Sequence, residues 1–139
     1  MALKQVTETV DDWGVKVLVA EDSPTVRRLV CTRLNADGYE VLEAVDGEEA
    51  LALALSERPA AVVLDKVMPK LDGFEVVRRL RESEQACDVP IVMLTEHASE
   101  DDVLGGLSLG VEEYMPKPFS PRELSLRLAR ILARNGGSG

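Results

Sequence analysis

Short apolar runs alternate with longer amphipathic segments five times along this chain, and this alternation restricts the fold more than any other feature. The runs are KVLVA (16–20), YEVLEA (39–44), AAVVL (60–64), PIVMLT (90–95) and EEYM (112–115). Runs of this length predict β-strands, and the amphipathic segments between them predict α-helices. Five strand–helix units in succession predict a parallel sheet with helices on both faces, joined by right-handed crossovers. We therefore expect an α/β fold in which the glutamate-bearing strand 39–44 lies at an edge.

Capping signals mark where most of the helices begin. Ser23 precedes Pro24, the favoured order of an N-cap and a first helical residue. Asp46 takes the capping position before EEALALALSE, where Ala, Leu and Glu favour a helix over a strand. Ser99 and Ser120 begin the capping-box patterns SEDD and SPRE. These signals support helices rather than further strands between the apolar runs.

Composition narrows the function classes. One domain accounts for 139 residues, and the net charge of −9 argues against a surface for nucleic acid or anionic membrane. The two cysteines show no metal-type or redox-type spacing, and no apolar run approaches the length of a membrane span. Without a secretory signal pattern, a cytoplasmic location is expected. We expect a flexible leader over residues 1–14, the folded domain over 15–134 and a linker-like tail over 135–139.

Polar side chains follow or end four of the predicted strands. Glu21 and Asp22 follow the first strand, Asp65 follows the third, Thr95 ends the fourth and Lys117 lies just beyond the fifth. Each is ordinary by itself, since single acids at strand ends often form turns or caps. The carboxyl ends of parallel strands lie at one edge of a sheet, where ligands bind, so these side chains are expected to converge on one cleft. Clustered carboxylates repel one another and require a cation.

The residue types at this edge predict both the ion and the chemistry. Oxygen ligands without His or Cys favour Mg²⁺, which takes one or two carboxylates and keeps several waters. Asp22 and Asp65 fit that role, with Glu21 acting through water. Mg²⁺ and Lys117 together would attract a phosphoryl group, and Thr95 would be able to donate to one of its oxygens. Transfer of a phosphoryl group onto a carboxylate is the predicted reaction, and Asp65, the lone central acid, is the best nucleophile.

Four segments in this order resemble the receiver domain of two-component response regulators, the CheY-like fold. They are VLVAEDSP (17–24), VVLDKVMPKLDGFEVV (62–77), PIVMLTE (90–96) and EEYMPKPFSPREL (112–124). The resemblance covers roughly residues 15–134. It implies a flavodoxin-like (βα)5 architecture, a doubly wound sheet whose five parallel strands lie in the order 2-1-3-4-5.

The resemblance also implies a role for each acidic residue of the predicted cleft. Asp65 corresponds to the phospho-acceptor. Glu21 and Asp22 correspond to the acidic pair, of which Asp22 binds Mg²⁺ directly. Asp65 and the backbone carbonyl of Val67 complete the protein ligands of the metal.

Four more residues take roles from the same resemblance. Lys117 corresponds to the lysine that pairs with the phosphate, and the bond between Lys117 and Pro118 is cis in relatives. Thr95 corresponds to the switch hydroxyl and Tyr114 to the mobile aromatic residue. The expected phosphoryl donor is a phosphohistidine of a sensor histidine kinase or phosphotransfer protein. The domain would catalyse only its own phosphorylation and dephosphorylation.

The expected output is a change in the surface formed by residues 99–109 and 112–115. An output domain or a downstream protein would recognise this surface. A homodimer through the same face, extended by the helix that begins at Ser120, is a further expectation. No direct contact of this domain with nucleic acid or membrane is expected.

Two residues depart from the family pattern. Lys66 stands where an apolar residue usually follows the acceptor, and Glu96 stands where a small residue usually follows the threonine. Glu96 beside the phosphoryl path predicts slow labelling by small donors, and an ion pair with Lys66 would hold it aside. Val67 and His97 occupy the positions that tune dephosphorylation. Val67 cannot orient a water, which predicts a long-lived phosphoryl state, whereas His97 is interpreted as a solvated loop residue or a water-orienting group.

A pair of glycines lies inside the helix expected over residues 99–109. Each of Gly105 and Gly106 costs about 1 kcal/mol relative to Ala in a helix interior. Two interpretations remain open. The pair makes a labile signalling helix, or it allows close packing.

Three other functions share part of the pattern. A pseudo-receiver would keep the fold and bind a partner without phosphorylation, which the complete set of acids, threonine and lysine at the strand ends argues against. A phosphatase of the aspartyl-phosphate type needs a second acid two residues after its nucleophile, and that position is Val67. A flavodoxin-type cofactor binder needs a phosphate-cradling loop after the first strand, where EDSPT would repel a phosphate.

Overall fold

Five strands form one sheet in the order β2-β1-β3-β4-β5. The computed structural model describes residues 14–137 except residues 97 and 98. The strands are β1 (Lys16–Ala20), β2 (Glu40–Ala44), β3 (Ala61–Asp65), β4 (Ile91–Thr95) and β5 (Glu113–Pro116). Every neighbouring pair is parallel. The predicted α/β class and strand order are confirmed, and β2 lies at an edge as expected.

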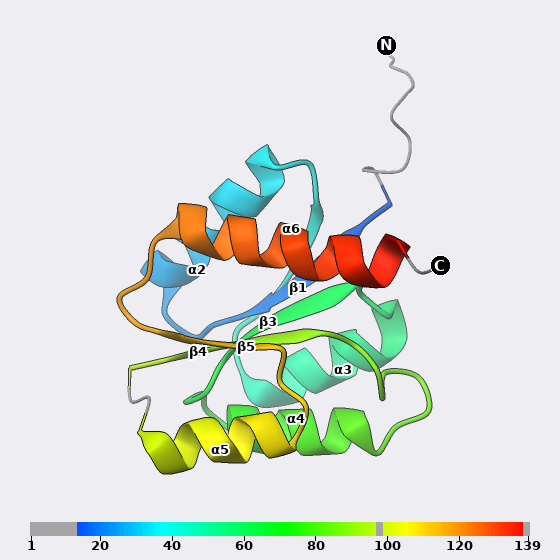
Figure 1. Ribbon diagram of the computed structural model, residues 1–139, viewed down its shortest axis with the longest axis vertical. Coiled ribbons are helices and arrows are strands. Elements are labelled where there is room, and N and C mark those ends of the chain that lie inside the picture. The colour runs from blue at the N-terminus through cyan, green and yellow to red at the C-terminus, as the bar shows by residue number, and fades with distance from the viewer. Residues whose placement is uncertain (1–13, 97–98, 138–139) are drawn as a thin grey trace.

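Helices cover both faces of the sheet (Figure 1). They are α2 (Pro24–Ala36), α3 (Gly47–Glu57), α4 (Gly73–Arg81), α5 (Glu100–Ser108) and α6 (Pro121–Gly137). Helices α2 and α6 lie on one face, and α3, α4 and α5 lie on the other. Within the described part of the chain, every helix is too short or too polar to span a bilayer.

The core is divided by the sheet into two layers. Successive residues of a strand point to opposite faces, so Val17 and Val19 of β1 face α2 and α6, while Leu18 and Ala20 face the other helices. All residues of β3 and β4 are buried. Burial on both faces explains why these strands read as continuous apolar runs, and it fixes them in the middle of the sheet.

Side-chain caps begin four of the helices, three of them at the predicted residues Ser23, Asp46 and Ser120. Ser23, Asp46, Asp72 and Ser120 each accept a hydrogen bond from the backbone N–H three residues later, at distances between 2.8 and 3.3 Å. Each bond satisfies a donor that the first turn of a helix leaves open. At the other end of the chain, α6 continues to Gly137, so the boundary expected after residue 134 lies within the helix. Residues 1–13 of the expected leader and 138–139 of the expected tail lie outside the described residues.

Two glycines let the β3–α4 loop approach its neighbours closely. A Cβ on Gly73 would lie 2.7 Å from the carbonyl oxygen of Asp65, and a Cβ on Gly47 would clash with the carbonyl of Leu71. The Gly47 N–H also donates to the Pro69 carbonyl at 3.2 Å. The loop that follows Asp65 is therefore fixed against the first residues of both α3 and α4.

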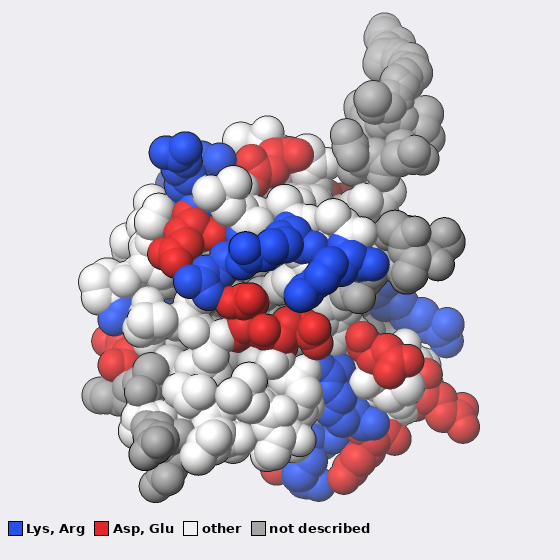
Figure 2. Space-filling view, viewed as in Figure 1, with Lys and Arg blue, Asp and Glu red and all other residues white. Residues whose placement is uncertain are grey.

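Positive charges gather along α6, although the whole chain carries a net charge of −9 (Figure 2). Arg127 of this helix pairs with two acids, with Nη1 2.5 Å from Glu113 Oε1 and Nη2 2.7 Å from Glu123 Oε2. Part of this basic band is thus neutralised within the chain.

Candidate functional site

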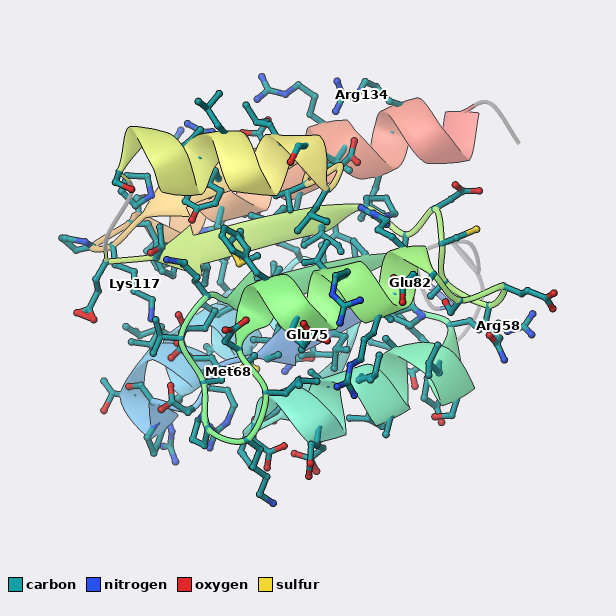
Figure 3. The ribbon with its side chains drawn as sticks, turned by 90° about the horizontal axis from the view of Figure 1, so that it is seen from below. Arg58, Met68, Glu75, Glu82, Lys117 and Arg134 are labelled. Atoms are coloured by element: carbon teal, nitrogen blue, oxygen red, sulfur yellow. The ribbon has the colours of Figure 1, made fainter. Side chains whose placement is uncertain are left out.

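The five side chains singled out at the predicted strand ends lie at the carboxyl edge of the sheet. Asp65 ends β3 and Thr95 ends the neighbouring β4, while Glu21 directly follows β1 and Lys117 directly follows β5. Figure 3 shows Lys117 at the same end of the sheet as the β3–α4 loop. Since β1 and β3 are neighbours, the acids that follow β1 come next to Asp65.

Three carboxylates lie together at this edge. One oxygen from each of Glu21, Asp22 and Asp65 falls within 4.8 Å of the others. Glu21 is fully buried and Asp65 is 5% exposed, whereas Asp22 is exposed. Glu21 Oε1 is buried and accepts no hydrogen bond from the described residues. Three hard oxygen donors, two of them withdrawn from water, suit a divalent cation such as Mg²⁺.

Lys117 completes the charge arrangement. Its Nζ lies 2.9 Å from Glu21 Oε1, an ion pair outside hydrogen-bonding geometry, and 3.4 Å from Asp65 Oδ2. Burial opposes the charge of this ammonium, but the two carboxylates outweigh burial and raise the pKa of Lys117. The backbone N–H of Lys117 donates to the Thr95 carbonyl at 2.6 Å, and the bond from Lys117 to Pro118 is cis, as the resemblance implies.

The pKa of Asp65 is high for a carboxylic acid. Burial and the Glu21 carboxylate raise the pKa of Asp65 to about 7, although Lys117 and the Val67 N–H act in the opposite direction. The Val67 N–H donates to Asp65 Oδ1 at 3.4 Å. A carboxyl group with this pKa holds a proton for much of the time at neutral pH, and a cation beside it would favour the ionised form.

Three other expected residues, Thr95, Val67 and His97, differ in where they lie. Thr95 is 1% exposed at the end of β4 and lies within the site. The side chain of Val67 points outward, since the residue is 64% exposed. His97 lies outside the described residues, so its predicted tuning role stays a prediction.

Tyr114 packs between α4 and α5. Its ring centroid lies 6.5 Å from that of Phe74, with the two rings tilted by 54°. A Cβ on Gly106 would lie 2.9 Å from the Tyr114 ring, and a Cβ on Gly105 would lie 3.5 Å from Phe74. Of the two interpretations of the glycine pair, this geometry favours close packing at Gly106, whereas Gly105 has room for a Cβ.

Lys66 has a partner that sequence reasoning did not identify. Its ammonium lies 5.2 Å from the centroid of the Phe74 ring, a distance typical of a cation–π interaction. Among the ion pairs of the described residues, none joins Lys66 to Glu96. No local sequence signal marks the contact, because the fold of the β3–α4 loop brings Lys66 and Phe74 together.

A groove of about 330 Å³ opens beside Lys117. It is lined by Val26, Leu29, Glu96, Lys117, Pro118, Phe119 and Pro121. Leu29 is 56% exposed, so an apolar side chain of this lining is open to solvent. The lining is largely apolar, and Glu96 and Lys117 are its charged members.

The sequence matches one protein family and a group of regulators. The family model of the response regulator receiver domain matches residues 17–129. The chain is 48% identical over 119 residues to a probable transcriptional regulator, ycf27, of Porphyridium aerugineum, and the match covers 86% of this chain and 48% of that protein. The chain therefore spans about half the length of the curated relatives it matches.

Solved structures agree with this match. The chemotaxis protein CheY4 of Vibrio cholerae is 39% identical, with a TM-score of 0.79 over 84% of this chain and 97% of that chain. The receiver domain of the sensor histidine kinase PA1611 of Pseudomonas aeruginosa is 35% identical, with a TM-score of 0.75 over 87% of this chain and 96% of that chain. That structure has a magnesium ion coordinated in its active site cleft.

Proposed function

Because this chain belongs to the response regulator receiver domain family, we propose that Asp65 accepts a phosphoryl group from a phosphohistidine of a sensor histidine kinase or phosphotransfer protein. The chain is a receiver of a two-component system, a signalling module. The observation that carries the proposal is the setting of the Asp65 carboxylate. It is buried at the end of a central strand, grouped with two other acids and 3.4 Å from the Lys117 ammonium.

The proposed reaction is an in-line displacement at phosphorus. An oxygen of the ionised Asp65 carboxylate forms a P–O bond while the P–N bond to the donor histidine breaks. The electron pair of that bond stays on the imidazole nitrogen, and the ring departs as neutral imidazole because its other nitrogen already carries a proton. Most of the rate enhancement is attributed to the fixed position of the Asp65 carboxylate, because β3 and the closely packed β3–α4 loop restrict its movement.

Cationic groups offset the charge of the phosphoryl oxygens in this proposal. Lys117, already charged and close to Asp65, pairs with one oxygen. Glu21, Asp22, Asp65 and the carbonyl of Val67 would hold Mg²⁺, which supplies further charge neutralisation when bound. Self-phosphorylation and its reversal by water are the only reactions proposed for the domain.

The groove beside Lys117 is the proposed approach for the donor. Its apolar lining and the exposed Leu29 offer contact area to a partner whose phosphohistidine reaches toward Asp65. Glu96 stands at the border of this path, so a small anionic donor meets its charge without compensating contacts. Slow labelling by small donors therefore stays part of the proposal, as does a long-lived phosphoryl state attributed to Val67.

The proposed output surface comprises α5, β5 and α6. Thr95 and Tyr114 are the proposed switch residues, and Tyr114 contacts α5 at Gly106. Leu104 and Leu107 on α5 are 58% and 55% exposed, and Leu126 on α6 is 61% exposed. These apolar side chains support recognition by an output domain, a downstream protein or a second copy of the chain. The relatives named as transcriptional regulators are about twice as long as this chain, which supports an output domain as the partner of the receiver. The proposed location is the cytoplasm.

A phosphorylation assay tests the proposal. The protein is incubated with Mg²⁺ and a phosphoramidate donor, and intact mass is measured with time. We expect the mass of one added phosphoryl group. This addition should not occur when excess EDTA is added before the donor, and it should not occur in Asp65→Asn. Asp72→Asn is the matched control because it changes a nearby acid to a residue that still caps α4. Equal labelling of wild type and Asp65→Asn contradicts the proposal.

Beryllofluoride separates the receiver from the phosphorylation-independent alternative. We expect Mg²⁺-dependent changes in the amide spectrum of α5 and β5 with beryllofluoride, absent in Asp65→Asn. A spectrum unchanged by beryllofluoride, together with no labelling, identifies a pseudo-receiver that acts only as a protein-interaction module.

A further inference from the structure

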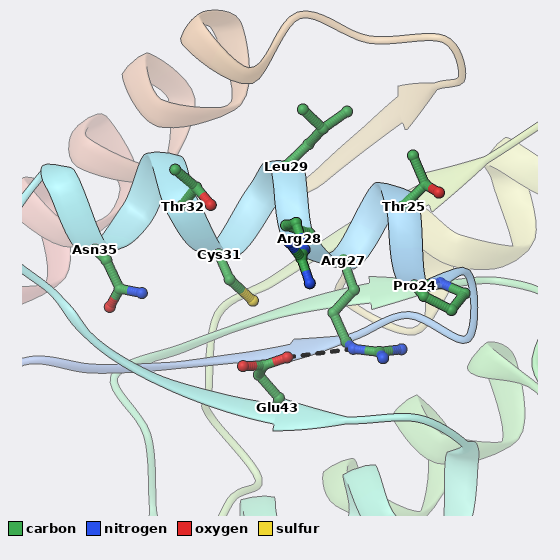
Figure 4. Close-up of a pocket in the computed structure, with 9 residues that line it drawn as sticks. All are labelled: Pro24, Thr25, Arg27, Arg28, Leu29, Cys31, Thr32, Asn35 and Glu43. Carbon is green, nitrogen blue, oxygen red and sulfur yellow. Dashed lines mark hydrogen bonds and ion pairs between the residues drawn. The ribbon is translucent and has the colours of Figure 1, made fainter.

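Arg27 joins three elements next to the acidic cluster. Its Nη1 donates to the carbonyl oxygen of Glu21 at 2.7 Å, and its Nε donates to Glu43 Oε1 at 3.2 Å. Figure 4 shows this guanidinium reaching from α2 to Glu43 on the strand beneath. The Arg27 side chain is only 17% exposed, whereas Arg28 beside it is exposed. Arg27 therefore fastens α2, the β1–α2 turn and β2 to one another.

Glu21, the first residue of that turn, is held at each of its polar atoms. Its N–H donates to the Ala44 carbonyl at 3.1 Å, and its Oε2 accepts from the Ser23 N–H at 3.1 Å. Its Oε1 lies 2.9 Å from Lys117 Nζ. The remaining polar atom, the carbonyl oxygen, accepts from Arg27. Arg27 thus supplies the last constraint on a fully buried residue of the cation site.

The Glu21 carbonyl belongs to the peptide that leads into Asp22. A peptide unit is planar, so a fixed carbonyl oxygen fixes the plane from which the next residue departs. Asp22 is exposed, and within the described part of the chain no hydrogen bond or ion pair holds its carboxylate. Its backbone therefore sets the position and direction of the Cα–Cβ bond from which that carboxylate reaches the cation site.

We propose that Arg27 is a positioning residue of the Mg²⁺ site, which holds the Glu21 carbonyl and thereby directs the Asp22 carboxylate to the cation. Glu43 keeps the guanidinium in this place and offsets its charge. The inference rests on the proposed function, since it concerns the same cation. Loss of a group that orients a metal ligand from behind typically weakens metal affinity by about 10-fold to 100-fold.

The charge of Arg27 and its positioning contact predict opposite changes in Mg²⁺ affinity when the side chain is removed. A guanidinium repels a divalent cation, so loss of its charge alone would strengthen Mg²⁺ binding. Loss of a positioning contact releases the Glu21–Asp22 peptide and would weaken binding. The sign of the change in Mg²⁺ affinity therefore separates the two roles.

The test compares Arg27→Met with Arg28→Met by calorimetric titration of Mg²⁺ at constant ionic strength. Both variants lose one positive charge, one residue apart on α2. We expect Arg27→Met to raise the Kd for Mg²⁺ about tenfold, as for other residues that orient metal ligands. Arg28→Met is expected to leave the Kd unchanged or to lower it. Arg27→Lys keeps the charge and reaches one acceptor at most, so an intermediate Kd is expected.

A second readout distinguishes positioning from a general loss of structure. In the metal-free protein, we expect the NMR chemical shifts of the Asp22 and Ser23 amides to change in Arg27→Met and to remain as in wild type in Arg28→Met. If Arg27→Met does not fold, Arg27→Lys carries the comparison. A Kd for the Arg27 variants equal to or below that of Arg28→Met overturns this inference and leaves the proposed function standing. Wild-type protein that binds no Mg²⁺ overturns both.

Discussion

Gly106 lies directly against the ring of Tyr114. A Cβ at this position would come within 2.9 Å of Cε2 and 3.0 Å of Cδ2 of the ring. The neighbouring Gly105 differs, because its Cβ would lie 3.5 Å from Phe74, an ordinary van der Waals distance. The close approach of α5 to the tyrosine on β5 therefore depends on one glycine of the pair.

Substitution of each glycine by alanine should give opposite results. We expect Gly106→Ala to lower the free energy of unfolding by about 1–3 kcal/mol, since the new methyl group displaces the Tyr114 ring. Gly105→Ala should leave stability unchanged or raise it by up to about 1 kcal/mol through better helix propensity. Urea denaturation of both variants measures the difference. Equal effects would show that helix propensity, rather than the tyrosine contact, governs this helix.

Arg81 ties the end of α4 to two loops at the amino end of the sheet. Its Nε donates to the Leu109 carbonyl at 3.0 Å and its Nη2 to the Gly110 carbonyl at 2.8 Å. Its Nη1 donates to the carbonyls of Val89 at 2.7 Å and Cys87 at 3.1 Å. One side chain thus anchors the C-terminal end of α5 and the loop that enters β4.

We expect Arg81→Ala to destabilise the domain by about 2–4 kcal/mol, because four backbone carbonyls lose a charged donor. Amide hydrogen exchange should rise most around Leu109 and Gly110. Arg79→Ala is the matched control, as Arg79 makes an exposed pair with Glu75 that contributes little. A loss of stability in Arg79→Ala as large as in Arg81→Ala would contradict the anchoring role.

The raised pKa of Asp65 predicts a pH-dependent stability in the absence of metal. The pKa rises from 3.8 to about 7, so between these values the folded protein binds a proton that the unfolded chain has released. This contribution to stability is fully present below the lower value and is lost as pH rises through about 7. In EDTA, Asp65→Asn should therefore be more stable than wild type above neutral pH, and the advantage should shrink as pH falls toward about 4.

Thermal denaturation across this pH range, with and without Mg²⁺, checks the prediction. Saturating Mg²⁺ should stabilise wild type and leave Asp65→Asn nearly unchanged, since binding to the folded state alone raises stability. Asp88→Asn, at an exposed acid, serves as the control and should follow wild type. The pKa assignment fails if Asp65→Asn and wild type keep the same difference in stability at every pH.

Glu96 on the border of the groove predicts a donor preference. Glu96→Ala should label with acetyl phosphate about threefold to tenfold faster than wild type, because it removes a negative charge from the path of an anionic donor. Glu112→Ala removes an exposed charge just before β5, at the amino ends of the strands and away from the site. This variant should label at the wild-type rate. Initial rates by intact mass measure both. Equal rates for all three proteins would remove Glu96 from the account of donor choice.

The fold was predictable because its signals are local. The central strands β3 and β4 are short apolar runs, and Ser23, Asp46 and Ser120 accept the capping hydrogen bonds that their positions predict. Alternating strands and helices leave few topologies once crossovers are right-handed. The glutamates of 39–44 indicated an edge because only an edge strand tolerates such side chains.

The sequence also determined which residues gather at the site. The carboxyl ends of parallel strands lie at the same edge of the sheet, however the helices are placed against it. Glu21, Asp65 and Lys117 therefore had to come together. Their distances and the raised pKa of Asp65 depended on burial, which the sequence does not specify.

Tertiary structure alone decided the contacts between side chains on different elements. Lys66 lies over Phe74, Arg27 holds the Glu21 carbonyl, and Tyr114 rests on Gly106. Each depends on how a helix is placed against the sheet, by a few ångströms of translation and a rotation about its axis. The periodicity of apolar residues predicts which face of a helix is buried. It does not predict these offsets, because several side-chain packing arrangements are compatible with the same apolar pattern.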